Sequence, residues 1–268
     1  MFKKALAFRI WLFVFIVGPV LLLVLSALTS YSILRSGPIQ VEFDALSILL
    51  NEIFIQAFLT SLKFAGYVTV ISLLIGYPVA YTLSQSKSPY KRLYILALIV
   101  PVWSNMLLRI IAFEKLFYPD SILNLFGIQL DLIGTDLAIV IGMTSIYLPF
   151  MIFPIYAVLE KLDSRVLEAA SDLYAHPFKR FWYVILPLSA GGIISGVLMT
   201  ALPAMTTFAL PERLSAGNTI LLGNLIENYV MRTAQVDVAS VIALGLLILM
   251  IGFYRVLLRF DAEGETLV

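Results

Sequence analysis

The sequence has no cysteine and a single histidine, and only 13% of its 268 residues are charged. The absence of cysteine excludes disulfides and thiolate metal sites. One histidine excludes a metal site built from several histidines. Soluble domains have about 25% charged and about 45–50% apolar residues, whereas 61% of this chain is hydrophobic. A soluble fold of this length could not bury so much apolar surface, so we expect a membrane protein.

The sequence contains several long apolar stretches. A spanning helix needs about 20 mostly apolar residues. Six stretches qualify, at 10–28, 64–83, 93–117, 137–159, 188–209 and 238–254. The first follows Lys3, Lys4 and Arg9 and could be a signal peptide, but its apolar run is longer than the usual core of about 7–15 residues. The sequence therefore predicts an all-α membrane protein with six transmembrane helices, the first of them retained.

Basic residues are distributed unevenly between the two sets of loops. With the N-terminus inside, the outer loops hold only Arg35, Arg213 and Arg232. The inner side then holds twelve: Lys3, Lys4, Arg9, Lys87, Lys91, Arg92, Lys161, Arg165, Lys179, Arg180, Arg255 and Arg259. Because lysine and arginine favour the cytoplasmic side, we expect a multi-pass protein of the cell membrane with both termini in the cytoplasm.

Acidic residues gather in the expected outer loops. They are Glu42, Asp44, Glu52, Asp120, Asp131, Asp136, Glu212, Glu227 and Asp237. Acids contribute little to topology, so membrane insertion does not require this excess. An acidic mouth would concentrate cations, although ordinary solvated loop charge explains the same residues.

The inner connection at 160–187 carries the most specific pattern. Its apolar positions recur at helical spacing on one face: Val166, Ala169, Ala170 and Leu173. Asp163 or Ser164 is placed to cap this helix, and Pro177 fits the first turn of a second short helix. Two such amphipathic helices could lie on the inner membrane surface or dock into a groove of another protein.

Within this connection, Glu168-Ala169-Ala170, followed later by Ile185-Leu186-Pro187, resembles the EAA loop of binding-protein-dependent ABC importer permeases. In that family the loop forms a coupling helix that sits in a cleft of the cytoplasmic ATPase subunit. The resemblance implies a type I ABC importer permease fold. The ATPase-coupling residues that it implies are Glu168, Ala169, Ala170, Asp172 and Tyr174.

One position departs from the family pattern, which has glycine where this chain has Tyr174. Glycine would permit a positive φ angle in the turn between the two short helices, and a tyrosine adopts that conformation only at a cost. We therefore expect a differently shaped turn that involves Ala175 and His176.

The resemblance covers roughly residues 57–257 as the permease domain, after a first helix and outer loop at 1–56 and before a cytoplasmic tail at 258–268. The stretches 100–111, 147–154, 202–205 and 222–225 are similar to spermidine/putrescine permeases, and more to their B-type subunit. Related permeases for iron, thiamine or phosphonates share much of this pattern, so these solutes remain alternatives.

A polyamine path needs oxygen ligands for ammonium groups and aromatic faces for cation–π contacts. The candidates are Trp103, Asn105, Arg109, Glu114, Tyr147, Pro203, Thr207 and Phe208. Arg109 would repel a cation, so we expect it to pair with an acid of another helix or subunit, or to gate the path. Glu114 lies near the outer mouth, where it either meets the cation or is an ordinary interface residue. Pro203 is the expected kink, and Gly192 and Gly196 are expected to allow close helix packing.

The chain has no Gly-Lys-Ser/Thr phosphate loop, so ATP and magnesium would be bound by a partner. The expected partners are a cytoplasmic ATPase dimer, a second homologous permease subunit, an extracytoplasmic polyamine-binding protein and membrane lipid, but no nucleic acid. We expect neither an enzyme nor a bound cofactor or metal. A secondary transporter would need inverted repeats and midplane ion sites, and a membrane enzyme would need clustered histidines or acids. The sequence shows none of these clearly.

Overall fold

The computed structural model describes residues 11, 13–29, 44–127, 129–173 and 176–265, and every element that it forms there is a helix. This confirms the predicted all-α class. Several residues used above lie outside the described part: Lys3, Lys4, Arg9, Arg35, Glu42, Tyr174 and Ala175.

Three long helices are apolar enough to cross a membrane: α3 (Glu52–Gln85), α6 (Asp136–Leu159) and α13 (Val236–Glu265), the last by its residues 236–256. The apolar window of α6 is 67% buried inside the chain, whereas those of α3 and α13 are each 28% buried. Helix α6 therefore lies at the centre of the bundle, and α3 and α13 leave most of their apolar surface uncovered.

Two further spans are bent. Helices α4 (Lys91–Trp103) and α5 (Met106–Phe117) meet at 93°. The second bent span consists of α8 (Pro177–Arg180), η4 (Phe181–Ile185) and α9 (Leu186–Leu188), which meet α10 (Ala190–Thr206) at 67°.

The prediction of one continuous helix over 93–117 is therefore wrong. The Ser104 hydroxyl donates to the Pro101 carbonyl at 2.7 Å, and the Asn105 side chain accepts the Leu107 N–H at 2.8 Å. Helix α4 thus ends in a side-chain cap and α5 begins with one, because short polar side chains here compete with the helical backbone bonds. In the second bent span the break lies at Ser189, whereas Pro203, the expected kink, lies inside α10.

The first apolar stretch folds as η1 (Phe13–Val17) and α2 (Gly18–Leu28), a helix shorter than a full span within the described residues. It packs against α13, as does η2 (Asp44–Leu50). The described part thus has five candidate spans by length, two of them bent, and this shorter helix at the place of the sixth.

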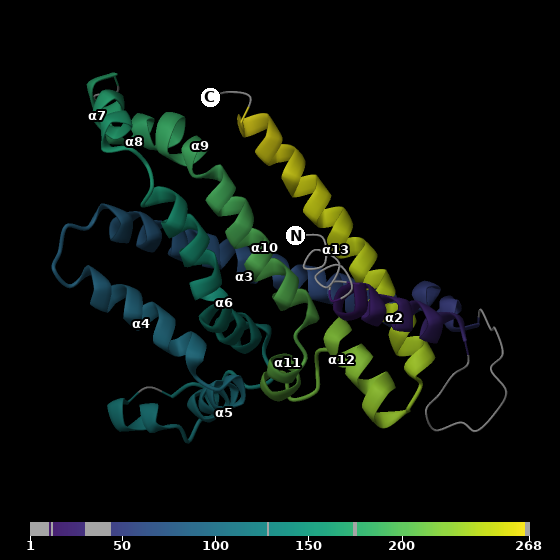
Figure 1. Ribbon diagram of the computed structural model, residues 1–268. Coiled ribbons are helices and arrows are strands. Elements are labelled where there is room, and N and C mark those ends of the chain that lie inside the picture. The colour runs from purple at the N-terminus through teal and green to yellow at the C-terminus, as the bar shows by residue number, and fades with distance from the viewer. Residues whose placement is uncertain (1–10, 12, 30–43, 128, 174–175, 266–268) are drawn as a thin grey trace.

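The connections lie at two ends of the molecule (Figure 1). Helices α7 (Ser164–Leu173) and α8 are at one end. At the opposite end lie α5, α11 (Ala209–Leu214) and η3 (Ile122–Phe126). Helix α12 (Leu222–Glu227) continues there into η5 (Asn228–Arg232). The expected inner and outer connections are therefore separated by the length of the bundle.

Glycines allow α10 to lie directly against α6. A Cβ atom on Gly192 would be 3.0 Å from the Ile155 Cα, and one on Gly196 would be 3.0 Å from the Met151 carbonyl oxygen. Neighbouring backbone atoms leave no room for a side chain at either position. The predicted close packing at this glycine pair is confirmed.

Candidate functional site

Helix α7 stands out at its end of the molecule because its own chain covers it poorly. The Asp163 side chain accepts the Arg165 N–H at 2.9 Å, which confirms one of the two expected caps. Glu168, Ala169 and Asp172 are exposed, and Leu173 is 79% exposed although it is apolar. Ala170, the third residue of the expected coupling triplet, is instead buried within this chain. An amphipathic helix with an uncovered leucine outside the bundle is suited to contact with another surface.

The second short helix is fastened to the bundle by one aromatic side chain. Pro177 lies in the first turn of α8, as predicted, and His176 Nδ1 accepts the Phe178 N–H at 3.2 Å. Phe181 packs edge-on against Tyr77 of α3 at 5.4 Å between ring centroids. Phe178 and Trp182 are exposed. The pair of short helices is therefore anchored on one side and open on the other.

A buried hydrogen bond fixes the break that follows these short helices. The Ser189 hydroxyl donates to the Leu186 carbonyl at 3.0 Å, so the Tyr77 hydroxyl, 2.9 Å away, is the donor to Ser189 Oγ. Ser189 is fully buried. Sequence reasoning missed this bond because the two residues are 112 positions apart and neither belongs to a recognisable motif.

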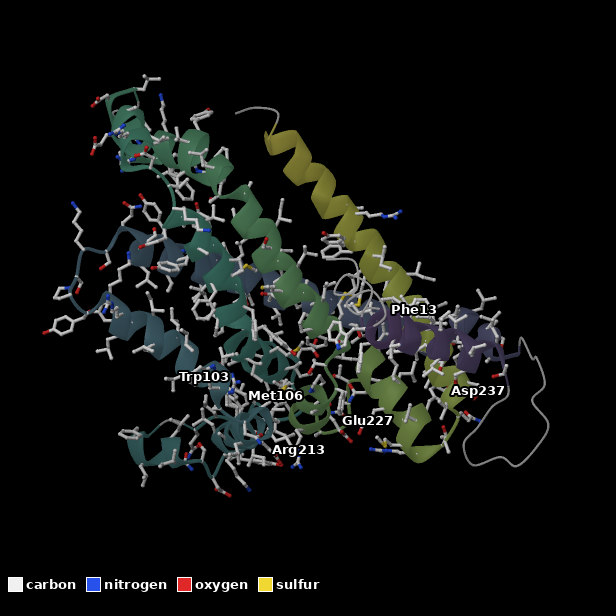
Figure 2. The ribbon with its side chains drawn as sticks, in the orientation of Figure 1. Phe13, Trp103, Met106, Arg213, Glu227 and Asp237 are labelled. Carbon is white, nitrogen blue, oxygen red and sulfur yellow. The ribbon has the colours of Figure 1, made fainter. Side chains whose placement is uncertain are left out.

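At the opposite end, four of the path candidates lie at or near the α4–α5 break: Trp103, Asn105, Arg109 and Glu114. Trp103 is 86% exposed, and Trp103 and Met106 flank the break at this end of the molecule (Figure 2). Asn105 caps α5. The Nε and Nη1 atoms of Arg109 are buried without a hydrogen-bond partner among the described residues, so the acid expected to pair with Arg109 is not found in this part of the chain.

Glu114 is engaged by a cation of this chain. Its carboxylate lies 3.3 Å from the Arg213 guanidinium of α11. This ion pair links α5 to α11, which also packs against both α5 and α6. The ion pair therefore joins α5, which carries Arg109 and Glu114, to α11, which directly follows Thr207 and Phe208 along the chain.

The other four path candidates lie at or near the end of α10: Tyr147, Pro203, Thr207 and Phe208. The Tyr147 hydroxyl donates to the Pro203 carbonyl at 3.4 Å, and the Thr207 N–H donates to the same oxygen at 3.0 Å. Thr207 is buried, whereas Phe208 is exposed. Asn224 of α12 donates its side-chain N–H to the Phe208 carbonyl at 2.9 Å. A second interruption of helical backbone is therefore held in place by polar contacts.

Pro203 also lines an apolar groove of about 650 Å³ between α6, α10 and α13. The other lining residues are Phe150, Leu198, Met199, Leu202, Leu247, Met250, Ile251 and Tyr254. An ammonium group left without oxygen ligands in such a groove would lose much of its hydration energy. The two helix breaks are chemically better suited to a cation than this groove is.

Ion pairs neutralise some of the expected outer acids. Asp136 lies 2.7 Å from Lys63, and Glu212 lies 2.9 Å from Arg232. Within the described ranges, five other outer acids have no ion-pair partner: Glu52, Asp120, Asp131, Glu227 and Asp237. The end of the molecule that carries both helix breaks therefore keeps unpaired carboxylates. Clusters of three or more histidines or acids that could hold a metal are absent from the described residues.

Residues 72–260 match the family of binding-protein-dependent transport system inner membrane components. The chain belongs to this family. It is also 37% identical over 249 residues to the spermidine/putrescine transport system permease protein PotB of Haemophilus influenzae, covering 90% of this chain and 86% of that protein. The PotB protein of Escherichia coli is 31% identical over 252 residues, covering 89% of this chain and 92% of its own length.

Solved structures share the fold of this membrane permease. A bacterial ABC transporter that imports the acidic polysaccharide alginate has a chain that superposes with a TM-score of 0.78 at 14% identity, covering 98% of this chain and 94% of its own. An amino acid ABC transporter with histidines gives a TM-score of 0.56 at 20% identity, covering 82% and 98%. The predicted type I permease fold is confirmed, and the chain is a multi-pass membrane protein of a transport family.

Proposed function

We propose that this chain is the permease subunit of an ATP-driven importer that carries polyamines such as spermidine and putrescine across the cell membrane. Helix α7, which lies outside the bundle with Glu168 and Ala169 of the Glu-Ala-Ala triplet exposed, supports the coupling to an ATPase. Identity of 37% to a spermidine/putrescine permease over 90% of the chain supports the substrate class.

Helix α7 is the proposed docking surface for a cytoplasmic ATPase dimer, which would bind ATP and magnesium. The exposed carboxylates of Glu168 and Asp172 offer hydrogen-bond acceptors, and Ala169 leaves room for close approach. Leu173 supplies apolar area that docking would bury. This role puts α7 and both chain termini on the cytoplasmic side.

The proposed substrate path runs past the two helix breaks at the opposite end. Non-helical backbone at membrane depth is tolerated only where it is buried in protein or lines a water-filled cavity. The breaks at Ser104–Asn105 and Thr207–Phe208 offer carbonyl oxygens to ammonium groups. The exposed Trp103 ring offers a cation–π face worth about 0.5–2 kcal/mol.

A second permease subunit would complete this path, and a polyamine-binding protein would deliver substrate to its acidic end. The apolar surfaces that α3 and α13 leave uncovered are available for a second subunit as well as for lipid.

Two alternatives make different predictions. An importer for iron, thiamine or phosphonates would use the same α7 docking but would not take up spermidine. A secondary transporter is compatible with broken helices, but it would have no use for an uncovered α7 and would not need an ATPase.

The test combines uptake with association. The chain is expressed with its partner subunits in cells that lack polyamine uptake, and entry of radiolabelled spermidine is measured with unlabelled putrescine, iron or thiamine as competitors. Competition by putrescine alone is expected. In a parallel pull-down, Ala169→Phe should release the ATPase, whereas Asp120→Ala at the other end should not. Failure of the unaltered chain to retain an ATPase would refute the proposal.

A further inference from the structure

Lys91, the first residue of α4, makes polar contacts to two other helices at once. Its ammonium nitrogen lies 2.7 Å and 3.0 Å from the two carboxylate oxygens of Glu160, and it donates to the Ser84 carbonyl of α3 at 3.1 Å. It also lies 5.7 Å from the centre of the Tyr156 ring of α6. One side chain therefore ties α4 to the neighbouring ends of α3 and α6.

Glu160 is placed at the root of α7. Its N–H donates to the Tyr156 carbonyl at 2.8 Å and so closes the end of α6. Three residues further on, Asp163 caps α7. Because the connection between Glu160 and α7 is this short, a displacement of α7 by a docked protein would also move Glu160.

Helix α4 is weakly held by apolar packing. None of its residues is buried within this chain, and Leu98 is one of its partly buried side chains at the hydrophobic core. Among the described residues, the contacts of Lys91 are therefore the polar contacts that attach the inner end of α4 to the bundle. The far end of the same helix is the break with Trp103 and Asn105.

We propose that the Lys91–Glu160 ion pair is a strut that transmits the movement of α7 to α4, and through α4 to the α4–α5 break. Both residues are positioning residues that touch no substrate. Their side chains are 21% and 41% exposed, so water still reaches this ion pair, and such pairs contribute little to folding stability compared with a whole transport cycle. A large effect on transport without loss of the folded complex would therefore identify a mechanical role. The inference rests on the proposed importer function.

Charge reversal and charge exchange test the strut in the full complex. Lys91→Glu and Glu160→Lys should each lower spermidine uptake at least about fivefold, the lower end of allosteric coupling effects. ATP hydrolysis should continue, so more ATP is consumed for each spermidine. The exchanged pair, Lys91→Glu with Glu160→Lys, should recover most of the uptake. Arg92→Glu is the control, because it makes the same charge change at an exposed neighbour on the same helix and should leave uptake nearly unchanged.

The outcomes separate the strut from the importer function. If the unaltered complex does not take up spermidine, the proposed function fails. If it does, but the single reversals transport normally or the exchange recovers nothing, the strut alone is refuted. Should a reversal prevent assembly, Lys91→Gln and Glu160→Gln replace it. Together they should then lower uptake no more than either does alone, and independent, additive losses would overturn the inference.

Discussion

The tight approach of α12 to the end of α10 makes Gly223 a sensitive position. A Cβ atom there would lie 2.7 Å from the Thr207 carbonyl oxygen and would also collide with the Thr206 carbonyl. Both obstacles are backbone atoms, which cannot rotate away as a flexible side chain can. Helix α12 must therefore shift in a Gly223→Ala variant.

The shift would stretch two hydrogen bonds that flank this glycine. The Leu222 N–H donates to the buried Ser61 hydroxyl at 2.8 Å, and the Asn224 side chain donates to the Phe208 carbonyl at 2.9 Å. Forcing extra atoms into packed sites typically costs about 1–3 kcal/mol. We expect Gly223→Ala to destabilise the folded chain by that amount and to lower spermidine uptake, because Phe208 belongs to the second helix break.

Gly66→Ala is the matched control. Gly66 lies within α3, is exposed, and has nothing within 4 Å of the added Cβ atom. Alanine is favoured over glycine inside a helix by about 0.5–1 kcal/mol, so this variant should be as stable as the original chain or more so. Thermal unfolding of the purified protein in detergent and uptake in cells measure both effects. Equal stability and uptake in the two variants would refute the account of this contact.

Three further experiments each test a single contact. Tyr77→Phe keeps the ring against the second short helix but removes its buried hydroxyl bond, so it should cost about 0.5–1.5 kcal/mol in thermal unfolding, whereas Tyr94→Phe on exposed α4 should cost nothing. Asp163→Ala removes the cap of α7, should weaken that helix by about 1 kcal/mol, and should reduce ATPase retention in a pull-down. A double-mutant cycle with Glu114→Gln and Arg213→Gln should give a coupling of about 0.2–1 kcal/mol, and a coupling of zero would show that α5 and α11 are not joined by this pair.

Hydropathy located the spans because contact with lipid requires apolar residues along a whole helix. Such a requirement is visible in the composition of each stretch. Hydropathy did not predict the α4–α5 break, because that break arises from local competition by Ser104 and Asn105 for backbone groups. The same limit explains the bend at Ser189, which is fixed by a hydroxyl of a distant helix. Proline was a guide at one position and not at another, since the α4–α5 break directly follows the turn that contains Pro101, whereas Pro203 continues α10.

The candidate site also combines features set by neighbouring residues with features set by distant ones. Neighbouring residues determine the helical face of α7, its Asp163 cap and the Pro177 turn, so these features could be predicted. The pairing of Glu114 with Arg213 could not, because the two are 99 positions apart and only the fold brings them together. Sequence reasoning identified the charged residues of the spans but not their partners.

The packing also indicates which helices can move independently. Gly192 and Gly196 bring the backbones of α10 and α6 into contact, so these two helices can shift only as one body. Helix α4 buries no residue in this chain, and it meets α5 at a break instead of a continuous helix. Force entering at α7 would therefore reach the path by tilting the far end of α4 against the α6–α10 body, and not by bending the body itself. In that case, locking the far end of α4 to α6 by a cross-link should preserve ATPase docking and abolish uptake.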